Sequence, residues 1–247
     1  IMFDEPVFKV FLYALITAVA TGFGAIPFFF VKKMPKKWLG WAGAIASGIM
    51  LAASFRLINE GINYNLYRTI IGVLIGLVFI LLSQKWLSKN EDLHVGQLSG
   101  ASAKKALMII GVMTIHSFAE GVGVGVSFGG EEGFGVFMSA AIAIHNIPEG
   151  LAISLVLIPK GMSTWKAGGW SIVSSLPQPL LAIPAFLFVS AFKPFLPIGL
   201  GLAAGAMIWM VFSDLLPDAL ENAKKQHVAT IATVSIAMMM LFQVLIE

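Results

Sequence analysis

Two copies of one short motif carry an imidazole and a carboxylate four residues apart. They read His116-Ser117-Phe118-Ala119-Glu120-Gly121 and His145-Asn146-Ile147-Pro148-Glu149-Gly150. Residues four apart share one face of a helix, so each copy directs its histidine and its glutamate the same way. Imidazole nitrogen and carboxylate oxygen together suit Zn²⁺ and admit Fe²⁺, Mn²⁺, Co²⁺ or Cu²⁺, whereas Ca²⁺ and Mg²⁺ prefer oxygen alone. The motifs therefore predict a site for a first-row divalent metal ion.

The composition indicates that both motifs lie within a membrane. Hydrophobic residues make up 58% of the chain and charged residues only 12%, against about 25% charged in an average soluble domain. Eight apolar runs approach the roughly 20 residues that a helix needs to cross a bilayer. The expected spans are residues 7–31, 38–58, 68–87, 106–128, 134–158, 167–192, 195–216 and 228–246. We predict an all-α membrane protein with one transmembrane domain over residues 1–247 and no separate soluble domain.

The basic residues predict how the chain is oriented. Most of the 16 lysines and arginines follow the first, third, fifth and seventh spans, and short cytoplasmic loops carry such an excess. Both termini should then be non-cytoplasmic. The chain begins at Ile1, and we expect a trimmed chain with no separate cleavable signal before the first span. The absence of cysteine excludes disulfides and thiolate metal sites, and the net charge of +3 suggests no nucleic-acid partner.

The two motifs should meet at one depth. The fourth and fifth spans are joined by the short segment 129–133 and therefore run antiparallel, with His116 level with Glu149 and His145 level with Glu120. A carboxylate at the bilayer centre costs at least about 2.5–3.5 kcal/mol unless it is compensated. No lysine or arginine lies in the middle of a predicted span, so protons, the histidines or a bound cation must neutralise the two glutamates.

Three other interpretations of the motifs stay open at this point. The histidines and glutamates can form hydrogen bonds that hold two helices together. They can serve a proton-coupled or metal-independent cation carrier, with the glutamates as proton sites. An intramembrane metal-dependent hydrolase would use similar ligands around an activated water, but the chain has no His-Glu-x-x-His motif.

The motifs resemble those of helices 4 and 5 in the ZIP (Zrt-, Irt-like protein) family of divalent metal transporters. Segments 48–55 and 204–209 and the eight-span layout resemble its bacterial-type, GufA-like branch. The resemblance implies a bundle with helices 4 and 5 central, alternating access that releases metal to the cytoplasm, and a homodimer. It implies a transporter rather than an enzyme, with no cofactor: the metal is the transported substrate, Zn²⁺ first, with Fe²⁺, Mn²⁺, Co²⁺ or Cd²⁺ as alternatives.

The resemblance also assigns metal ligands. His116, Glu120 and Glu149 match ligands of the family, and His145 matches its helix 5 histidine. Met50 matches a methionine that contacts the primary metal. Without the resemblance, Met50 would be read as a core residue.

Three further residues belong to the expected metal site and set its metal content. Asn146 follows the second histidine, Ser117 stands where many family members have asparagine, and Gln178 stands where relatives often have glutamate. Gln178 lies between two prolines near the middle of the sixth span, where an amide needs a partner. An amide in place of a carboxylate removes one negative charge and weakens a second cation beside the first. We therefore predict one principal metal ion rather than two.

Overall fold

The computed structural model describes residues 5–30, 35–89, 94–95, 98–130 and 132–246, and nearly all of them are helical. The α-helices are α1 (Glu5–Gly22), α2 (Pro27–Phe30), α3 (Lys36–Lys89), α4 (Gly100–Gly130), α5 (Glu132–Leu157), α6 (Thr164–Ser175), α7 (Pro177–Leu187), α8 (Val189–Phe192), α9 (Leu196–Met210), α10 (Leu216–Asn222) and α11 (Lys225–Ile246). Short 3₁₀ segments η1 (Phe23–Ala25) and η2 (Ile158–Lys160), a π-helical turn η3 (Val211–Leu215) and a two-stranded hairpin of β1 (His94–Val95) and β2 (Leu98–Ser99) complete the described elements.

Among the described residues, seven helical stretches are long and apolar enough to cross a membrane, which confirms the prediction of an all-α membrane protein. One of them, α3, holds two predicted spans, 38–58 and 68–87. Its 54 residues would extend about 80 Å as a straight helix, far more than the roughly 30 Å of a hydrocarbon core.

The two halves of α3 fold back on each other at Asn65. This residue has extended backbone angles, φ −167° and ψ 111°, and its side-chain oxygen accepts the N–H of Arg68 at 2.9 Å. That is the geometry of an N-cap, so Asn65 begins a second helix. A methyl group on Gly61 would meet the side chain of Thr69, because the halves lie close together just beyond the turn.

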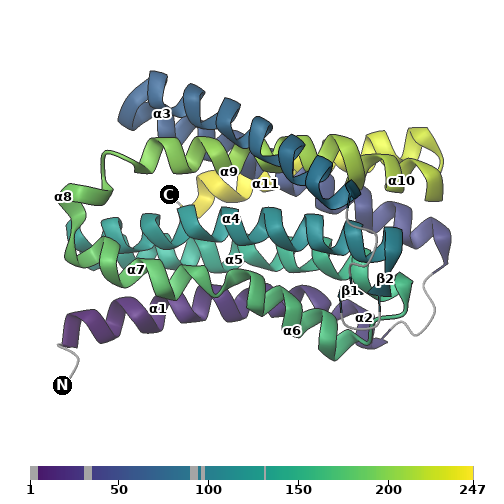
Figure 1. Ribbon diagram of the computed structural model, residues 1–247, viewed down its shortest axis with the longest axis horizontal. Coiled ribbons are helices and arrows are strands. Elements are labelled where there is room, and N and C mark those ends of the chain that lie inside the picture. Colours follow the sequence, from purple (N-terminus) through teal and green to yellow (C-terminus); the bar gives the residue numbers. More distant parts are fainter. Residues whose placement is uncertain (1–4, 31–34, 90–93, 96–97, 131, 247) are drawn as a thin grey trace.

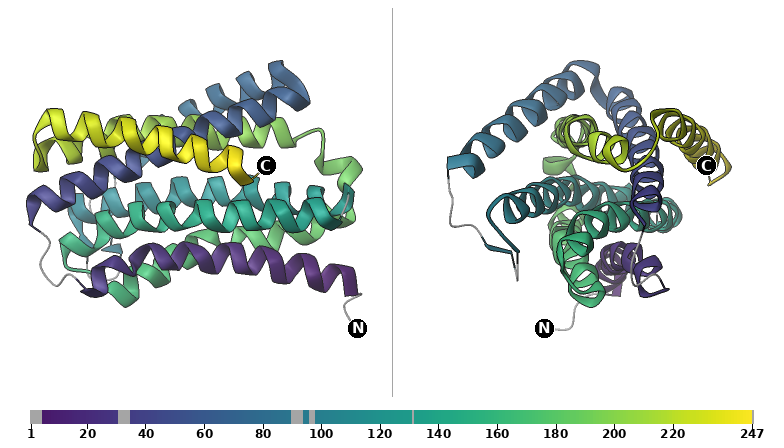
Figure 2. Two further views of the ribbon diagram at one scale, coloured as in Figure 1. Left: turned by 180° about the vertical axis from the view of Figure 1, so that it is seen from behind. Right: turned by 90° about the vertical axis from the view of Figure 1, so that its right-hand side faces the viewer.

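The helices form three layers, with α4 and α5 in the middle (Figure 1). One outer layer holds α3, α9, α10 and α11, and the other holds α1, α6 and α7; the end-on view in Figure 2 shows the same arrangement. α4 packs against α7 on one side and against α9 on the other, while α5 packs against α1 and α6. α1 begins and α11 ends toward the same end of the bundle (Figure 1).

Glycines allow α1 to approach α5 very closely. A methyl group on Gly150 would overlap the carbonyl oxygen of Thr21, and one on Gly24 would overlap the backbone at Gly150 and Leu151. Backbone cannot yield as the end of a flexible side chain can, so larger residues at these positions must push the helices apart.

We expect Gly150→Ala to destabilise the folded protein by about 3 kcal/mol, because overpacking here forces a backbone shift. Thermal unfolding in detergent measures the effect. Gly169→Ala is the matched control, since a methyl group on Gly169 meets no atom within 4 Å. Equal melting temperatures for the two variants would contradict the close approach.

Candidate metal centre

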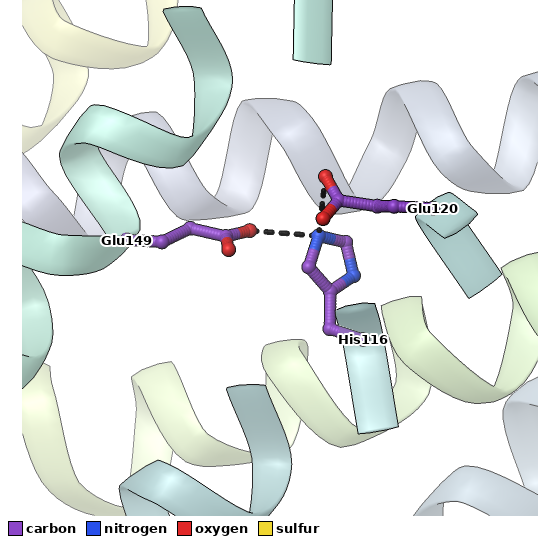
Figure 3. A group of neighbouring side chains, drawn as sticks. All are labelled: His116, Glu120 and Glu149. Carbon is purple, nitrogen blue, oxygen red and sulfur yellow. Dashed lines mark ion pairs between the residues drawn. The ribbon is translucent and has the colours of Figure 1, made fainter. Parts of the chain in front are cut away.

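The structure brings His116 and Glu120 of α4 together with Glu149 of α5 (Figure 3). Nε2 of His116 lies 2.7 Å from Oε1 of Glu149 and 3.3 Å from Oε1 of Glu120. One ligand atom from each of the three residues lies within 4.8 Å of the others. His116 and Glu120 share a face because they are four residues apart, and the antiparallel packing of α4 and α5 brings Glu149 to the same depth.

The three side chains are buried within the bundle. His116 is 0%, Glu149 1% and Glu120 4% exposed. Charged carboxylates are almost never buried to this degree unless they are paired or coordinate a metal. One imidazole between two carboxylates supplies the mixed nitrogen and oxygen donors that zinc and its first-row neighbours accept.

Gln178 reaches this centre because of a break between α6 and α7. The N–H of Leu176 bonds to the carbonyl of Val173 at 3.3 Å, a 3₁₀ contact that closes α6. Pro177 and Pro179 then lack the N–H groups that would continue the helix, and Pro177 suits a first helical position. The break places Gln178, which is fully buried, in the first turn of α7.

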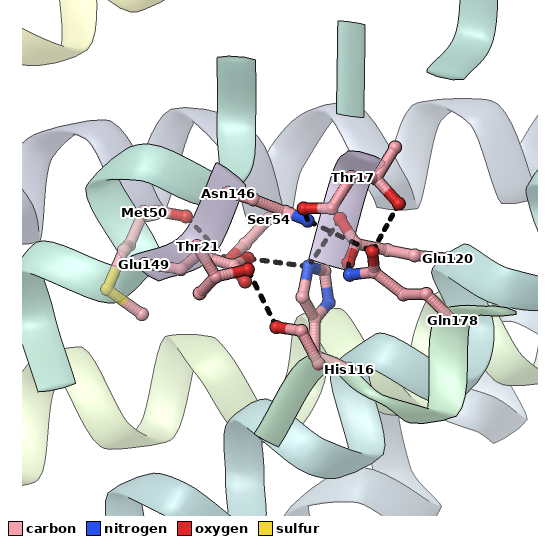
Figure 4. Close-up of polar contacts among 10 residues, drawn as sticks. Thr17, Thr21, Met50, Ser54, His116, Glu120, Asn146, Glu149 and Gln178 are labelled. Carbon is pink, nitrogen blue, oxygen red and sulfur yellow. Dashed lines mark hydrogen bonds and ion pairs between the residues drawn. The ribbon is translucent and has the colours of Figure 1, made fainter. Parts of the chain in front are cut away.

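The amide of Gln178 joins the metal-ligand candidate Glu120 to a wider polar network (Figure 4). Its Nε2 donates to Oε2 of Glu120 at 2.5 Å. Its Oε1 accepts from Oγ1 of Thr17 at 2.5 Å and from Nδ2 of Asn146 at 3.1 Å. Asn146 Nδ2 also donates to the carbonyl of Thr17 at 2.8 Å. The network therefore connects α1, α4, α5 and α7 at one point.

The other predicted site residues are placed differently. The side chain of His145, which α5 carries, lies outside the described part of the structure. Met50 is fully buried in α3 and belongs to the apolar cluster that also holds Met113 and Ile153. Ser117 is fully buried, and its hydroxyl has no hydrogen-bond partner among the described residues.

α1 contributes polar residues near the centre that the sequence alone did not reveal. Thr17 and Thr21 are fully buried one helical turn apart; Thr17 contacts Gln178, and Thr21 lies 2.7 Å from Ser175 Oγ. Two polar residues at helical spacing in an apolar span were the available signal. It was weak, because threonine hydroxyls in membrane helices often lie against a carbonyl of their own helix, and Thr17 Oγ1 lies 2.7 Å from the carbonyl oxygen of Ala14.

Comparison with known proteins identifies the family of this chain. The family model described as "ZIP Zinc transporter" matches residues 82–243. The chain belongs to the ZIP zinc transporter family, as the motifs on α4 and α5 suggested, and it is a multi-pass membrane protein.

Individual relatives extend the similarity over almost the whole chain. A putative zinc transporter of Arabidopsis thaliana is 48% identical over 239 residues, which cover 96% of this chain and 38% of the plant protein. The zinc transporter ZIPB of Bordetella bronchiseptica is 32% identical over 88% of this chain and 73% of its own length. The zinc transporter GufA of Myxococcus xanthus is 27% identical over 88% of this chain and 91% of its own length. The chain thus spans less than half of the plant relative and most of the bacterial ones.

Proposed function

We propose that this protein carries a divalent metal ion across a membrane, with zinc as the first candidate, and that His116, Glu120 and Glu149 bind the ion in transit. The observation that supports this most strongly is the cluster of two carboxylates and one imidazole, buried where the bundle would cross the bilayer. Membership of the ZIP family and the similarity to proteins named zinc transporters support the choice of cargo.

The charge of the cluster fits one divalent ion. Two carboxylates and a neutral imidazole carry a charge of −2, which a single M²⁺ neutralises. Gln178 and Asn146 are amides and add no charge, so a second divalent ion beside the first would meet uncompensated repulsion in a region of low dielectric. Zinc suits the donor set, and Fe²⁺, Mn²⁺, Co²⁺ and Cd²⁺ are alternative cargoes because geometry and availability, as well as ligand type, govern selectivity.

A cavity offers the ion a path to the cluster from one end of the bundle. It lies between the middle layer and the outer layer of α3, α9 and α11, and Glu120 and Ala119 line it. Arg56 and Glu60 line both this cavity and a wider vestibule of about 650 Å³. Glu60 lies one helical turn from Arg56 on the same face of α3. The negative charge of Glu60 therefore offsets the positive charge of Arg56 along the proposed path of the cation.

At the opposite end, an ion pair joins the same two layers. Nζ of Lys105 on α4 lies 2.5 Å from Oδ2 of Asp218 on α10 and 3.9 Å from Oδ1 of Asp214 in η3. The metal site is therefore open to one end of the bundle, while the ion pair holds the two layers together at the other end. Alternating access requires two states, and this arrangement is one of them. Movement of the middle layer relative to α3, α9 and α10 would break this ion pair and release the metal there.

The direction of transport follows from the proposed topology. With Asn65 dividing α3 in two, the chain crosses the membrane eight times and both termini lie on the non-cytoplasmic side. The lysine-rich loops then face the cytoplasm. The vestibule at Glu60 faces outward, and the ion leaves toward the cytoplasm past Lys105.

We expect Glu149→Gln and His116→Ala each to reduce uptake of Zn²⁺ into proteoliposomes to background, because each removes a ligand from a three-residue cluster. Radioactive or fluorescent metal uptake measures this. The matched control is Glu132→Gln, which neutralises an exposed glutamate at the start of α5, the helix that carries Glu149. Uptake that survives both site substitutions would remove the cluster from the mechanism and favour a carrier that needs no metal site.

Purified protein should bind one Zn²⁺ per chain at saturation, since one ion already balances the buried charge. Equilibrium dialysis with elemental analysis gives the ratio. Two tightly held ions per chain would refute the charge argument.

The absence of cysteine allows the outward path to be tested with single introduced thiols. A membrane-impermeant thiol reagent applied from the outside should modify Met138→Cys, whose position lines both the cavity and the vestibule, and should slow uptake. Lys225→Cys, at the exposed start of α11, should remain unmodified under the same conditions. The opposite labelling pattern would reverse the proposed orientation.

A further inference from the structure

A network of three fully buried polar side chains lies behind the carboxylate of Glu120. Thr17, Asn146 and Gln178 are each 0% exposed, and they come from three different helices (Figure 4). Gln178 is the member that touches Glu120. Its own amide is held in turn by the other two residues.

The backbone of α1 fixes the orientation of both amides. The carbonyl oxygen of Thr17 only accepts hydrogen bonds, so the atom of Asn146 that lies 2.8 Å from it must be the nitrogen. The same nitrogen lies 3.1 Å from the amide of Gln178 and needs an acceptor there, which must be Oε1. The NH₂ group of Gln178 therefore faces Glu120 and donates to its Oε2.

The hydroxyl of Thr17 completes this arrangement. A hydroxyl has one hydrogen, and Oγ1 lies close to both the carbonyl of Ala14 and Oε1 of Gln178. The Ala14 carbonyl, being inside α1, already accepts a helical N–H. Two oxygens 2.5 Å apart repel each other unless a hydrogen lies between them. Oγ1 also lies 2.7 Å from the Ala14 oxygen, but the contact with Oε1 of Gln178 is the shorter one, so we assign the hydroxyl hydrogen of Thr17 to Gln178.

From this geometry we propose that Thr17 is a positioning residue for the metal site, and that Gln178 transmits its effect to Glu120 instead of binding the ion itself. The proposal rests on the function proposed above. Gln178 occupies Oε2 of Glu120, so this carboxylate presents the single oxygen Oε1, which lies beside His116 Nε2. Without the Thr17 hydroxyl, Oε1 of Gln178 keeps only one of its two hydrogen-bond donors, Asn146. The amide of Gln178 is then held less firmly against Glu120, and Glu120 can bind metal through both oxygens.

Co²⁺ bound to the purified protein in detergent reports this change, because its visible absorption weakens as coordination number rises. We expect Thr17→Val to bind Co²⁺ about tenfold more weakly, as for the loss of one hydrogen bond to a neutral partner. Its absorption per bound ion should also be lower. Thr17→Ser keeps the hydroxyl and should restore both the affinity and the spectrum of the unmodified protein.

The matched control is Thr21→Val. Thr21 lies one turn further along α1 and is equally buried, but its hydroxyl lies against Ser175 instead of Gln178. It should bind Co²⁺ with unchanged affinity and spectrum. If Thr21→Val lost as much Co²⁺ affinity as Thr17→Val, the loss would come from the general packing of α1. That result would overturn the proposal.

A second variant tests the route through Gln178. Gln178→Met removes the amide at similar volume and should alter the Co²⁺ spectrum as Thr17→Val does. Combining the two substitutions should add no further loss, because residues in one network are not additive. Additive losses, or a Thr17→Val protein that binds Co²⁺ like the unmodified one, would refute the positioning role while leaving the transport proposal intact. Unmodified protein that binds no Co²⁺ or Zn²⁺ would instead refute the transport proposal, and with it this one.

Discussion

The whole arrangement depends on compensating two carboxylates that are buried among apolar helices. Glu120 and Glu149 cannot remain charged there without a partner, since an uncompensated buried charge costs several kcal/mol or more. His116 stands between them and can accept a shared cation. In the proposed function, a bound divalent ion supplies this compensating charge, so the need for neutrality would help to select and hold the ion.

The glycine that ends each motif explains how the rest of the site can gather around the carboxylates. A methyl group on Gly121, directly after Glu120, would meet the backbone of Gln178; one on Gly150, directly after Glu149, would meet the carbonyl of Thr21. Small residues let membrane helices approach closely. Each copy of the motif therefore supplies a buried carboxylate and, in the next residue, the space for a neighbouring helix, α7 in one case and α1 in the other.

The features that could be predicted from the sequence were those with a strong local signal. Apolar runs of sufficient length mark the spans, and the short link between α4 and α5 makes them antiparallel, so the proximity of His116 to Glu149 follows from helical geometry alone. The predicted spans end at residue 58 and resume at residue 68, but they do not place the fold-back at Asn65, because an N-cap depends on one side chain at a position that many residues can occupy. Thr17 could not be assigned, since its role arises from α7 reaching across to α1, a contact between residues 161 positions apart.

The central claim is that a travelling cation neutralises the buried cluster. Anomalous X-ray scattering at the zinc absorption edge, from crystals grown in lipid with Zn²⁺, tests it most directly. The account predicts one strong peak within bonding distance of His116 Nε2 and of one oxygen each from Glu120 and Glu149, with Gln178 still bonded to Glu120. A peak elsewhere, or saturating zinc with these three side chains pointing away from one another, would contradict it.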